Sequence, residues 1–339
     1  MKLVRNAMLV CGLCLPVLAL AQSAAPLTTS TPTPAPAPYT AATTYAKLIG
    51  KYPFIRIAGS ELPASVRAVR DIAYMRRGEH ALQLDLYLPA QQAAVPAPAV
   101  VFVHGGGWQT GNRAEFAPMA IRMAERGFAT ATVSYRLSPE ARYPAAIHDV
   151  KSALRWVRAH AGEYGIDPAR IAVAGGSAGG QIASLVGVTN GVARFDPDGG
   201  PGAVSSAAQA IVNIDGLSDF TSPAARENED NPAKRPTAAG SWLGGSYAEA
   251  ADTWHDASPT FHVSAKTPPI LFIGSAQARF AVGREAMIEK MTAQGVAAQT
   301  VLLPDTPHSF WLFDPWLAPT VEATVAFLRT RMAAGSGRP

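Results

Sequence analysis

Gly175-Gly176-Ser177-Ala178-Gly179 follows the apolar run Ile171–Ala174 and opens Ala178–Val188, a stretch suited to a helix. A G-x-S-x-G sequence between a strand and a helix is typical of a tight turn that pushes a serine hydroxyl out of the edge of a sheet. The glycines let backbone segments approach without a Cβ clash. The amides at the start of the helix can face developing negative charge. This stretch predicts a nucleophilic Ser177, although an ordinary strand–helix turn would also fit it.

Strand and helix patterns alternate on both sides of this turn. The strand candidates are Ile72–Tyr74, Leu82–Leu88, Ala99–Val103, Thr130–Tyr135, Ile171–Ala174, Ala210–Ile214, Ile270–Ile273 and Thr300–Leu303. The helix candidates are Pro144–His160, Ala178–Val188, Gly283–Gln294 and Val321–Met332. From Ala99 onward the strand candidates are short and mostly apolar on both faces, as expected for strands covered by helices on two sides. We therefore predict an α/β domain with a mostly parallel central sheet of about eight strands.

One region, residues 221–262, interrupts this alternation. It contains a charge cluster at 226–230 and then Trp242 and Trp254. We interpret it as a small insertion after the sixth main strand that could form a lid. For its first half, a long solvated loop is an equally good interpretation.

The N-terminal sequence predicts export. Lys2 and Arg5 precede an apolar stretch, and Ala19-Leu20-Ala21 has the small-x-small pattern of a cleavage site, so residues 1–21 are expected to be a signal peptide. A membrane anchor is the alternative, but the apolar run is short and contains Pro16. Residues 22–45 are rich in Pro, Thr and Ala and are expected to form a disordered tether. A single domain is then expected over 46–339, in a periplasmic or secreted protein without a membrane anchor.

Composition excludes several classes of function. Of the 339 residues, 48% are hydrophobic and only 16% charged, so most of the chain can bury a core. The net charge is +4, or +2 once Lys2 and Arg5 are removed, and the basic residues form no stripe, so we expect no nucleic-acid partner. Both cysteines, Cys11 and Cys14, lie in the predicted signal peptide. The mature protein is therefore expected to lack a disulfide, a thiol nucleophile and a cysteine-ligated metal.

Two further motifs complement the serine. His104-Gly105-Gly106-Gly107-Trp108 follows an apolar strand, and three glycines there free backbone N–H groups to point at one spot. With the amide of Ala178, those N–H groups would form an oxyanion hole. His104 itself is better interpreted as fixing the loop. After the last strand, His308 is the best candidate for the base that a serine nucleophile needs.

Together these motifs resemble a known family. In their order along the chain, His104–Trp108, Ser134-Tyr135-Arg136-Leu137, Gly175–Gly180 and the loop of His308 look like the hormone-sensitive-lipase-like branch of the α/β-hydrolase esterases, over roughly residues 71–332. The resemblance implies the α/β-hydrolase fold, no metal or organic cofactor, and structural roles for Arg136 and Asp149. The site residues that it implies are the nucleophile Ser177, the base His308, and the oxyanion-hole donors Gly106, Gly107 and Ala178.

The acid departs from the family pattern. In these enzymes it usually follows the seventh strand as Gly-x-x-Asp, but here the matching stretch is Gly274-Ser275-Ala276-Gln277. Gln277 could orient an imidazole but could not stabilise imidazolium by charge. Our first choice for the acid is Asp215, at the end of the sixth main strand, and our second is Asp305, three residues before His308. A site without an acid, or with another residue as the acid, stays open.

Several side chains are candidates for binding substrate. Trp108 adjoins the oxyanion loop and Trp311 follows the base, and indole faces can stack on sugar rings. Trp242 and Trp254 of the insertion could stack on sugars in the same way, and packing against the last helix is the alternative for Trp311 and Phe313. A weaker resemblance to carbohydrate-active acetyl-xylan or pectin-type esterases adds Arg279, which could face a polar or acidic glycan or simply solvent.

The sequence thus favours a secreted serine esterase that hydrolyses small acyl esters, acetyl above all, on plant polysaccharides or oligosaccharides. A generalist carboxylesterase acting on small esters is the first alternative. The second is a non-catalytic glycan-binding protein on a decayed hydrolase scaffold, which only Gln277 favours. The sequence does not determine the oligomeric state.

Overall fold

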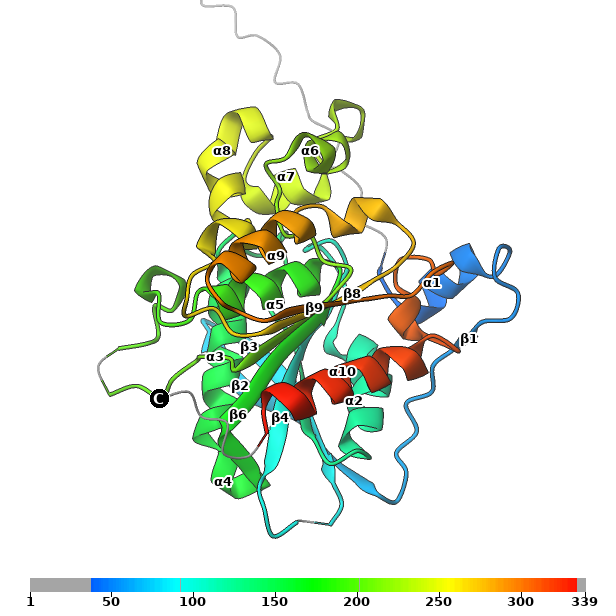
Figure 1. Cartoon of the computed structure of the whole chain (residues 1–339), viewed down its shortest axis with the longest axis vertical. Helices are drawn as coiled ribbons and strands as arrows, with labels where there is room; N and C mark the ends of the chain where they lie inside the picture. Colours follow the sequence, from blue (N-terminus) through cyan, green and yellow to red (C-terminus); the bar gives the residue numbers. More distant parts are fainter. Residues whose placement is uncertain (1–37, 92, 201, 334–339) are drawn as a thin grey trace, which may run out of the picture. The chain divides into compact units, whose positions relative to one another are not determined.

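The computed structural model describes residues 38–91, 93–200 and 202–333, and within these ranges eight strands form the central sheet (Figure 1). The strand order is β2-β3-β5-β4-β6-β7-β8-β9. The β2–β3 and β3–β5 pairs are antiparallel and all other pairs are parallel. The predicted mostly parallel sheet of about eight strands is confirmed.

The strands are β1 (Arg56–Ile57), β2 (Val66–Arg77), β3 (His80–Pro89), β4 (Ala97–Val103), β5 (Ala129–Val133), β6 (Ile166–Gly176), β7 (Ala210–Ile214), β8 (Ile270–Gly274), β9 (Ala298–Leu302) and β10 (Phe313–Asp314). The α-helices are α1 (Ala41–Leu48), α2 (Ala117–Ala124), α3 (Ala145–Ala159), α4 (Ala161–Tyr164), α5 (Ala178–Val188), α6 (Pro223–Glu229), α7 (Ala238–Leu243), α8 (Tyr247–Asp256), α9 (Arg284–Ala293) and α10 (Leu317–Arg331). Short 3₁₀ helices are η1 (Arg113–Phe116), η2 (Ala193–Phe195), η3 (Pro232–Lys234), η4 (Pro259–His262), η5 (Ala278–Ala281) and η6 (Phe310–Leu312).

Helices cover both faces of the sheet, which explains why its inner strands β5, β7 and β8 are buried along their whole length (Figure 1). On β4, Val101 and Val103 belong to one core cluster with residues of α3 and α5. The alternate residues Val100 and Phe102 belong to a second cluster with residues of α2 and α10. Because successive side chains of a strand point to opposite faces, each inner strand contributes to both clusters.

The insertion, residues 221–262, folds into α6, η3, α7, α8 and η4 rather than a solvated loop. Side-chain oxygens cap these short helices: Ser222 accepts the N–H of Ala225 in α6, and Thr237 accepts that of Gly240 in α7. Trp242 and Trp254 are both 0% exposed. The insertion therefore contributes to the core, and the loop interpretation of its first half is wrong.

The predicted tether extends too far. Residues 41–45 are helical in α1, which Thr40 caps through a capping box, and β1 then pairs with β10. Apolar side chains of this segment, Tyr39, Tyr45 and Leu48, pack against the second core cluster. The domain thus begins no later than residue 38. The predicted signal peptide, 1–21, lies outside the described residues, and within the described ranges we find no helix that is both long and apolar enough to cross a membrane.

Candidate active site

Ser177 lies in the turn between β6 and α5, with φ +57° and ψ −124°. Residues other than glycine rarely adopt this conformation, and strain of this kind gathers at functional sites. Glycines make the turn possible, because a Cβ on Gly175 would collide with the carbonyl oxygen of Gly179, and one on Gly179 with that of Val103. The N–H of Ser177 donates to the carbonyl of Ile214 on β7 (2.8 Å). The turn thus projects the serine from the carboxyl edge of the parallel strands.

His308, on the loop after β9, reaches Ser177 from the far end of the chain. Its Nε2 lies 2.8 Å from Ser177 Oγ. The imidazole stacks on the ring of Phe280, with centroids 3.4 Å apart and planes at 9°, and meets Trp311 edge-on at 5.3 Å. Burial lowers the pKa of His308 below 6.5; Asp215 opposes this effect and the charge of Arg279 adds to it. A lowered pKa favours the neutral ring, which is the form that can accept a proton.

Asp215 contacts His308 on the side of the ring away from Ser177, so that the three side chains form one continuous contact chain. It follows β7 and is 5% exposed, and its Oδ2 lies 3.0 Å from His308 Nδ1. Its other oxygen, Oδ1, accepts the backbone N–H of Ser275 at 2.7 Å. Asn213 stabilises the turn that carries the aspartate, since its side chain accepts the N–H of Gly216 (2.7 Å) and donates to the Gly216 carbonyl (3.1 Å). The carboxylate is thus fixed against the imidazole from two sides.

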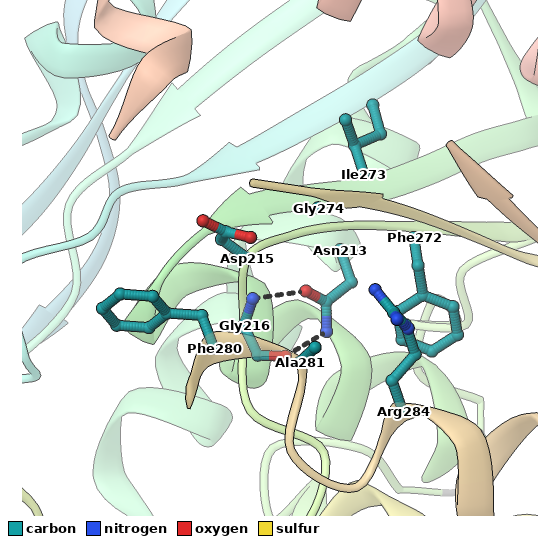
Figure 2. Close-up of a pocket in the computed structure, with 9 residues that line it drawn as sticks. All are labelled: Asn213, Asp215, Gly216, Phe272, Ile273, Gly274, Phe280, Ala281 and Arg284. Carbon is teal, nitrogen blue, oxygen red and sulfur yellow. Dashed lines mark hydrogen bonds between the residues drawn. The ribbon is translucent and has the colours of Figure 1, made fainter. Parts of the chain in front are cut away.

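A pocket adjoins this carboxylate on the side of β8 and η5 (Figure 2). Asp215 and Phe280 point to the same side of it, and the Arg284 side chain closes it from α9. Its lining residues are Asn213, Asp215, Gly216, Phe272, Ile273, Gly274, Phe280, Ala281 and Arg284.

The other acid candidates lie elsewhere. Asp305 is exposed in a turn with φ +60°, and among the described residues it forms no hydrogen bond or ion pair with His308. Gln277 is also exposed, and its side chain caps nothing at the start of η5. Of the two aspartates that we weighed, only Asp215 contacts the base. Ser275, two residues before Gln277, donates its N–H to Asp215 Oδ1 (2.7 Å).

The glycine loop after β4 lies beside the serine. Gly106 has φ +105° and Gly107 has φ +59°, and a Cβ on Gly106 would collide with the carbonyl of Thr110. In the described part of the chain, no turn, loop or cap hydrogen bond uses the N–H of Gly106, Gly107 or Ala178. These three amides, the predicted oxyanion-hole donors, are therefore free to face a ligand.

Buried side chains support this loop from below. His104 is 2% exposed, and burial lowers its pKa to about 4. Its ring stacks on Tyr135 (4.3 Å), whose hydroxyl donates to the His104 carbonyl. Glu115 accepts the N–H groups of Asn112 (2.9 Å) and Gly105, and burial raises its pKa to about 9. These contacts agree with the interpretation of His104 as a loop-fixing residue.

The predicted substrate contacts of the tryptophans are wrong, because the indoles are buried. Trp108 is 5% exposed, donates its N–H to Gln181 Oε1 (2.9 Å) and stacks on Trp242 (5.2 Å). Trp311 is 1% exposed and packs under His308. Trp242 and Trp254 lie in the core of the insertion. None of the four presents an indole face to a sugar.

Arg279, in contrast, lies at the rim. Its side chain is half-exposed, its guanidinium lies over Phe280 at 4.5 Å, and it pairs with Glu229 of α6 at 3.7 Å. Phe280, which lies in the short helix η5, was not predicted, because no motif marks a phenylalanine at this position. Its neighbour Arg279 was the only hint.

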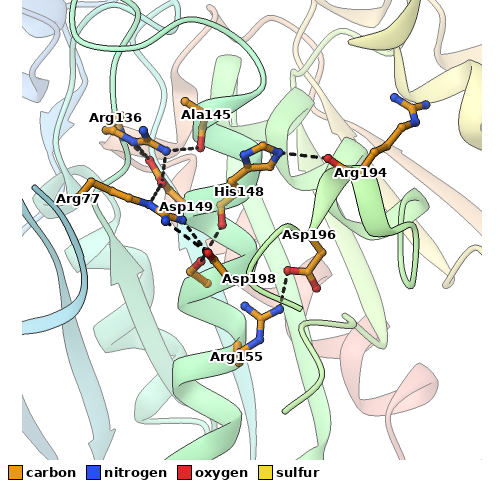
Figure 3. Close-up of polar contacts among 10 residues, drawn as sticks. Arg77, Arg136, Ala145, His148, Asp149, Arg155, Arg194, Asp196 and Asp198 are labelled. Carbon is orange, nitrogen blue, oxygen red and sulfur yellow. Dashed lines mark hydrogen bonds and ion pairs between the residues drawn. The ribbon is translucent and has the colours of Figure 1, made fainter. Parts of the chain in front are cut away.

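The Arg136–Asp149 pair has a structural place (Figure 3). Asp149 in α3 is 0% exposed. Its carboxylate accepts three hydrogen bonds from Arg136: from the backbone N–H (3.0 Å), from Nε (2.8 Å) and from Nη2 (2.8 Å). Since Arg136 lies shortly after β5, the pair ties the end of this strand to α3. The hydrogen bonds to Asp149 raise the pKa of Arg136.

Comparisons with known proteins agree with this architecture. The probable carboxylic ester hydrolase LipM of Mycobacterium tuberculosis is 34% identical over 245 residues, which are 71% of this chain and 56% of LipM. The chain thus spans little more than half the length of this relative.

Solved structures resemble most of the chain. A truncated carbohydrate esterase from gut microbiota has a TM-score of 0.64 and 25% identity, over 78% of this chain and 96% of its own. Esterase 2 of the planctomycete Thermogutta terrifontis, with butyrate bound, has a TM-score of 0.63 and 26% identity, over 80% of this chain and 97% of its own. The predicted resemblance to α/β-hydrolase esterases, with a weaker one to carbohydrate esterases, is confirmed. The BD-FAE family profile matches residues 84–280, more than half of the chain, and this protein therefore belongs to the BD-FAE family of α/β-hydrolases.

Proposed function

We propose that the protein is a serine esterase that hydrolyses carboxylic esters through an acyl-enzyme. The observation that carries this proposal is the unbroken contact chain from Ser177 Oγ to His308 Nε2 (2.8 Å) and from His308 Nδ1 to Asp215 Oδ2 (3.0 Å). A hydroxyl, a neutral imidazole and a carboxylate in this order can generate a nucleophile and then return its proton. The chemistry requires no metal or organic cofactor.

In the first half of the reaction, Ser177 Oγ attacks the ester carbonyl while His308 Nε2 takes its proton. The amides of Gly106, Gly107 and Ala178 hold the resulting oxyanion. The carboxylate of Asp215 keeps the Nδ1 proton in place and stabilises the imidazolium. Collapse of the intermediate breaks the C–O bond, and His308 gives its proton to the leaving alcohol.

In the second half, His308 removes a proton from water, and the hydroxide attacks the acyl carbon. The second oxyanion collapses, the acid leaves, and the proton returns to Ser177. Overall, one ester bond is broken, and water supplies the hydroxyl group of the acid and the proton of the alcohol.

Replacing the nucleophile tests this proposal. The Ser177→Ala variant is expected to lose activity on p-nitrophenyl acetate by at least about 1000-fold while its circular dichroism spectrum is unchanged. A serine-reactive fluorophosphonate should label the wild-type protein at Ser177 and leave the variant unlabelled. Retained activity in the variant would overturn the assignment, and an unlabelled wild-type protein would favour a non-catalytic glycan-binding function.

We also propose that the acyl group is small, acetyl above all, and that the ester belongs to a plant polysaccharide or its oligomers. The likeness to a gut carbohydrate esterase supports the glycan, and the butyrate in Thermogutta esterase 2 supports a short acyl chain. The half-exposed Arg279 beside the Phe280–His308 stack is the residue we expect to meet an acidic or polar sugar. Export by a signal peptide cleaved after Ala21, into the periplasm or the medium, would bring the enzyme to such a substrate.

A generalist carboxylesterase acting on small esters is the second candidate, and one observation favours it. The four tryptophans that could have formed a sugar platform, Trp108, Trp242, Trp254 and Trp311, are at most 5% exposed. Rates on p-nitrophenyl acetate, p-nitrophenyl butyrate and acetylated xylan, measured with the chain from Gln22, separate the two candidates. Release of acetate from xylan at a rate comparable to that from the small ester supports the polysaccharide substrate. Activity on the small esters alone supports the generalist.

A further inference from the structure

The first described residues of the chain run alongside the loop that carries His308. β1 pairs antiparallel with β10, and the N–H of Ala58 donates to the carbonyl of Leu312 at 3.0 Å. In α1, the ring of Tyr45 lies 6.4 Å from that of Phe313. Residues 38–58, which we call the N-terminal brace, therefore contact the backbone that follows the candidate base.

One residue of the brace reaches the site itself. The hydroxyl of Tyr39 donates to Ser309 Oγ at 2.8 Å, one residue after His308. Its backbone N–H donates to Thr110 Oγ1 at 2.9 Å. The edge of its ring also lies close to the oxyanion loop. A Cβ built on Gly105 would be 3.3 Å from Tyr39 Cε1 and 3.3 Å from Ser177 Cβ, so the tyrosine ring and the serine both lie next to the loop at this glycine.

The two residues that accept hydrogen bonds from Tyr39 lie in the His308 loop and in the oxyanion loop. Ser309 is 3% exposed and has φ +70°, a left-handed conformation that costs a non-glycine residue free energy unless neighbouring contacts hold it. Thr110 closes the oxyanion loop, because its N–H donates to the carbonyl of Gly106 at 3.1 Å. Burial raises the pKa of Tyr39, so its hydroxyl stays protonated and remains a donor.

We propose that Tyr39 is a positioning residue that holds the His308 loop and the oxyanion loop at a fixed distance from each other. The inference depends on the ester hydrolysis proposed above. In that reaction, the base and the oxyanion donors must act on the same substrate carbonyl, yet they come from loops about 200 residues apart. The Tyr39 hydroxyl donates to Ser309, so Tyr39 acts through the loops rather than on the reacting atoms.

The hydroxyl can be removed while the ring and the backbone contact are retained. The Tyr39→Phe variant is expected to lower kcat on p-nitrophenyl acetate about tenfold, short of the roughly 100-fold that a 1 Å misplacement of a catalytic group can cause. The KM should change less than about twofold, because ground-state binding of the small ester is untouched. The rate of labelling by a fluorophosphonate should fall by the same factor as kcat. Each rate is divided by the concentration of active sites that the fluorophosphonate titrates, so that unfolded protein does not lower the kcat.

The partner and a matched tyrosine provide the controls. Ser309→Ala removes the acceptor and should reproduce the loss, and the double variant should be no slower than either single variant, because both remove one hydrogen bond. Tyr45→Phe lies on the same brace, where the Tyr45 hydroxyl has no hydrogen-bond partner among the described residues, and it should retain the wild-type kcat.

Four results would overturn the inference. A wild-type kcat and labelling rate in Tyr39→Phe would show that the hydroxyl does not position the two loops. Multiplicative losses in the double variant would show that Tyr39 and Ser309 act separately, and a change in KM alone would make Tyr39 a substrate contact. A wild-type protein that the fluorophosphonate does not label would overturn the esterase proposal first, and this inference with it.

Discussion

Replacing Asp215 by asparagine tests the candidate site most sharply, because the structure determines how the new amide would lie. Oδ1 of Asp215 accepts the N–H of Ser275 at 2.7 Å, so the amide oxygen must take this place. The amide NH₂ would then face His308 Nδ1, which could only accept. The imidazole proton would move to Nε2, which points at Ser177 Oγ, and His308 could no longer take the proton of the serine.

The magnitude follows from the charge that is lost. Asp215 Oδ2 lies 3.0 Å from Nδ1, so the centres of carboxylate and imidazolium are about 4 Å apart, where two charges at an effective dielectric constant of about 20 attract by about 4 kcal/mol. Loss of this stabilisation in the transition state corresponds to a fall in kcat of about 1000-fold. The KM should stay within about threefold, because Asp215 is 5% exposed and lies behind the imidazole.

Steady-state kinetics on p-nitrophenyl acetate measures both effects, with circular dichroism to verify the fold. Asp305→Asn is the matched control: this aspartate is exposed, makes no described contact with His308, and should keep the wild-type kcat. If Asp215→Asn kept more than about a tenth of the wild-type kcat, or if Asp305→Asn lost as much, the reasoning from the contact chain would be refuted.

Three other substitutions test the surroundings of the site. Phe280→Ala should let water reach His308, raise its lowered pKa toward 6.5 and move the acidic limb of the kcat/KM profile to higher pH; an unmoved or lower limb would contradict the role of the stack. Glu115→Gln should stabilise the protein by up to about 3 kcal/mol at pH 7, because the native carboxyl, with its pKa raised to about 9, must take up a proton that the unfolded chain, with a pKa of 4.5, does not bind. That gain should vanish below about pH 4.5 in urea denaturation, and a constant gain would point to packing instead. Asp149→Asn should destabilise the fold by about 3–5 kcal/mol, since Arg136 loses its buried partner; a loss below about 1 kcal/mol would make the pair dispensable.

The sheet could be predicted from the sequence because its inner strands are mostly apolar on both faces. The run Val100–Val103 has no polar residue, and the structure covers both of its faces. The turn at Ser177 was predictable for a similar reason: close approach leaves glycine as the only fit at Gly175 and Gly179. Constraints of this kind are local, so they can be inferred from a few neighbouring residues.

Contacts that depend on the direction of one side chain were not predictable. Trp108 and Trp311 flank site residues in the sequence, but adjacency does not say whether an indole points outward or into the core, and burial of a large apolar ring favours the core. The N–H of Ser275 was not predictable either, since every residue but proline has one. The Pro-rich composition suggested a tether up to residue 45, yet Tyr39, Tyr45 and Leu48 offer enough apolar surface to dock.

The pairing of β1 with β10 joins residues that are more than 250 positions apart, and Tyr39 meets Ser309 across a similar span. During synthesis, the N-terminal brace leaves the ribosome long before its partners exist. It stays without these partners until residues 309–314 have been made, and contacts between such distant segments form late and slowly in folding. A polypeptide interrupted before residue 309 would therefore lack both the strand that pairs with β1 and the residue that accepts the Tyr39 hydroxyl.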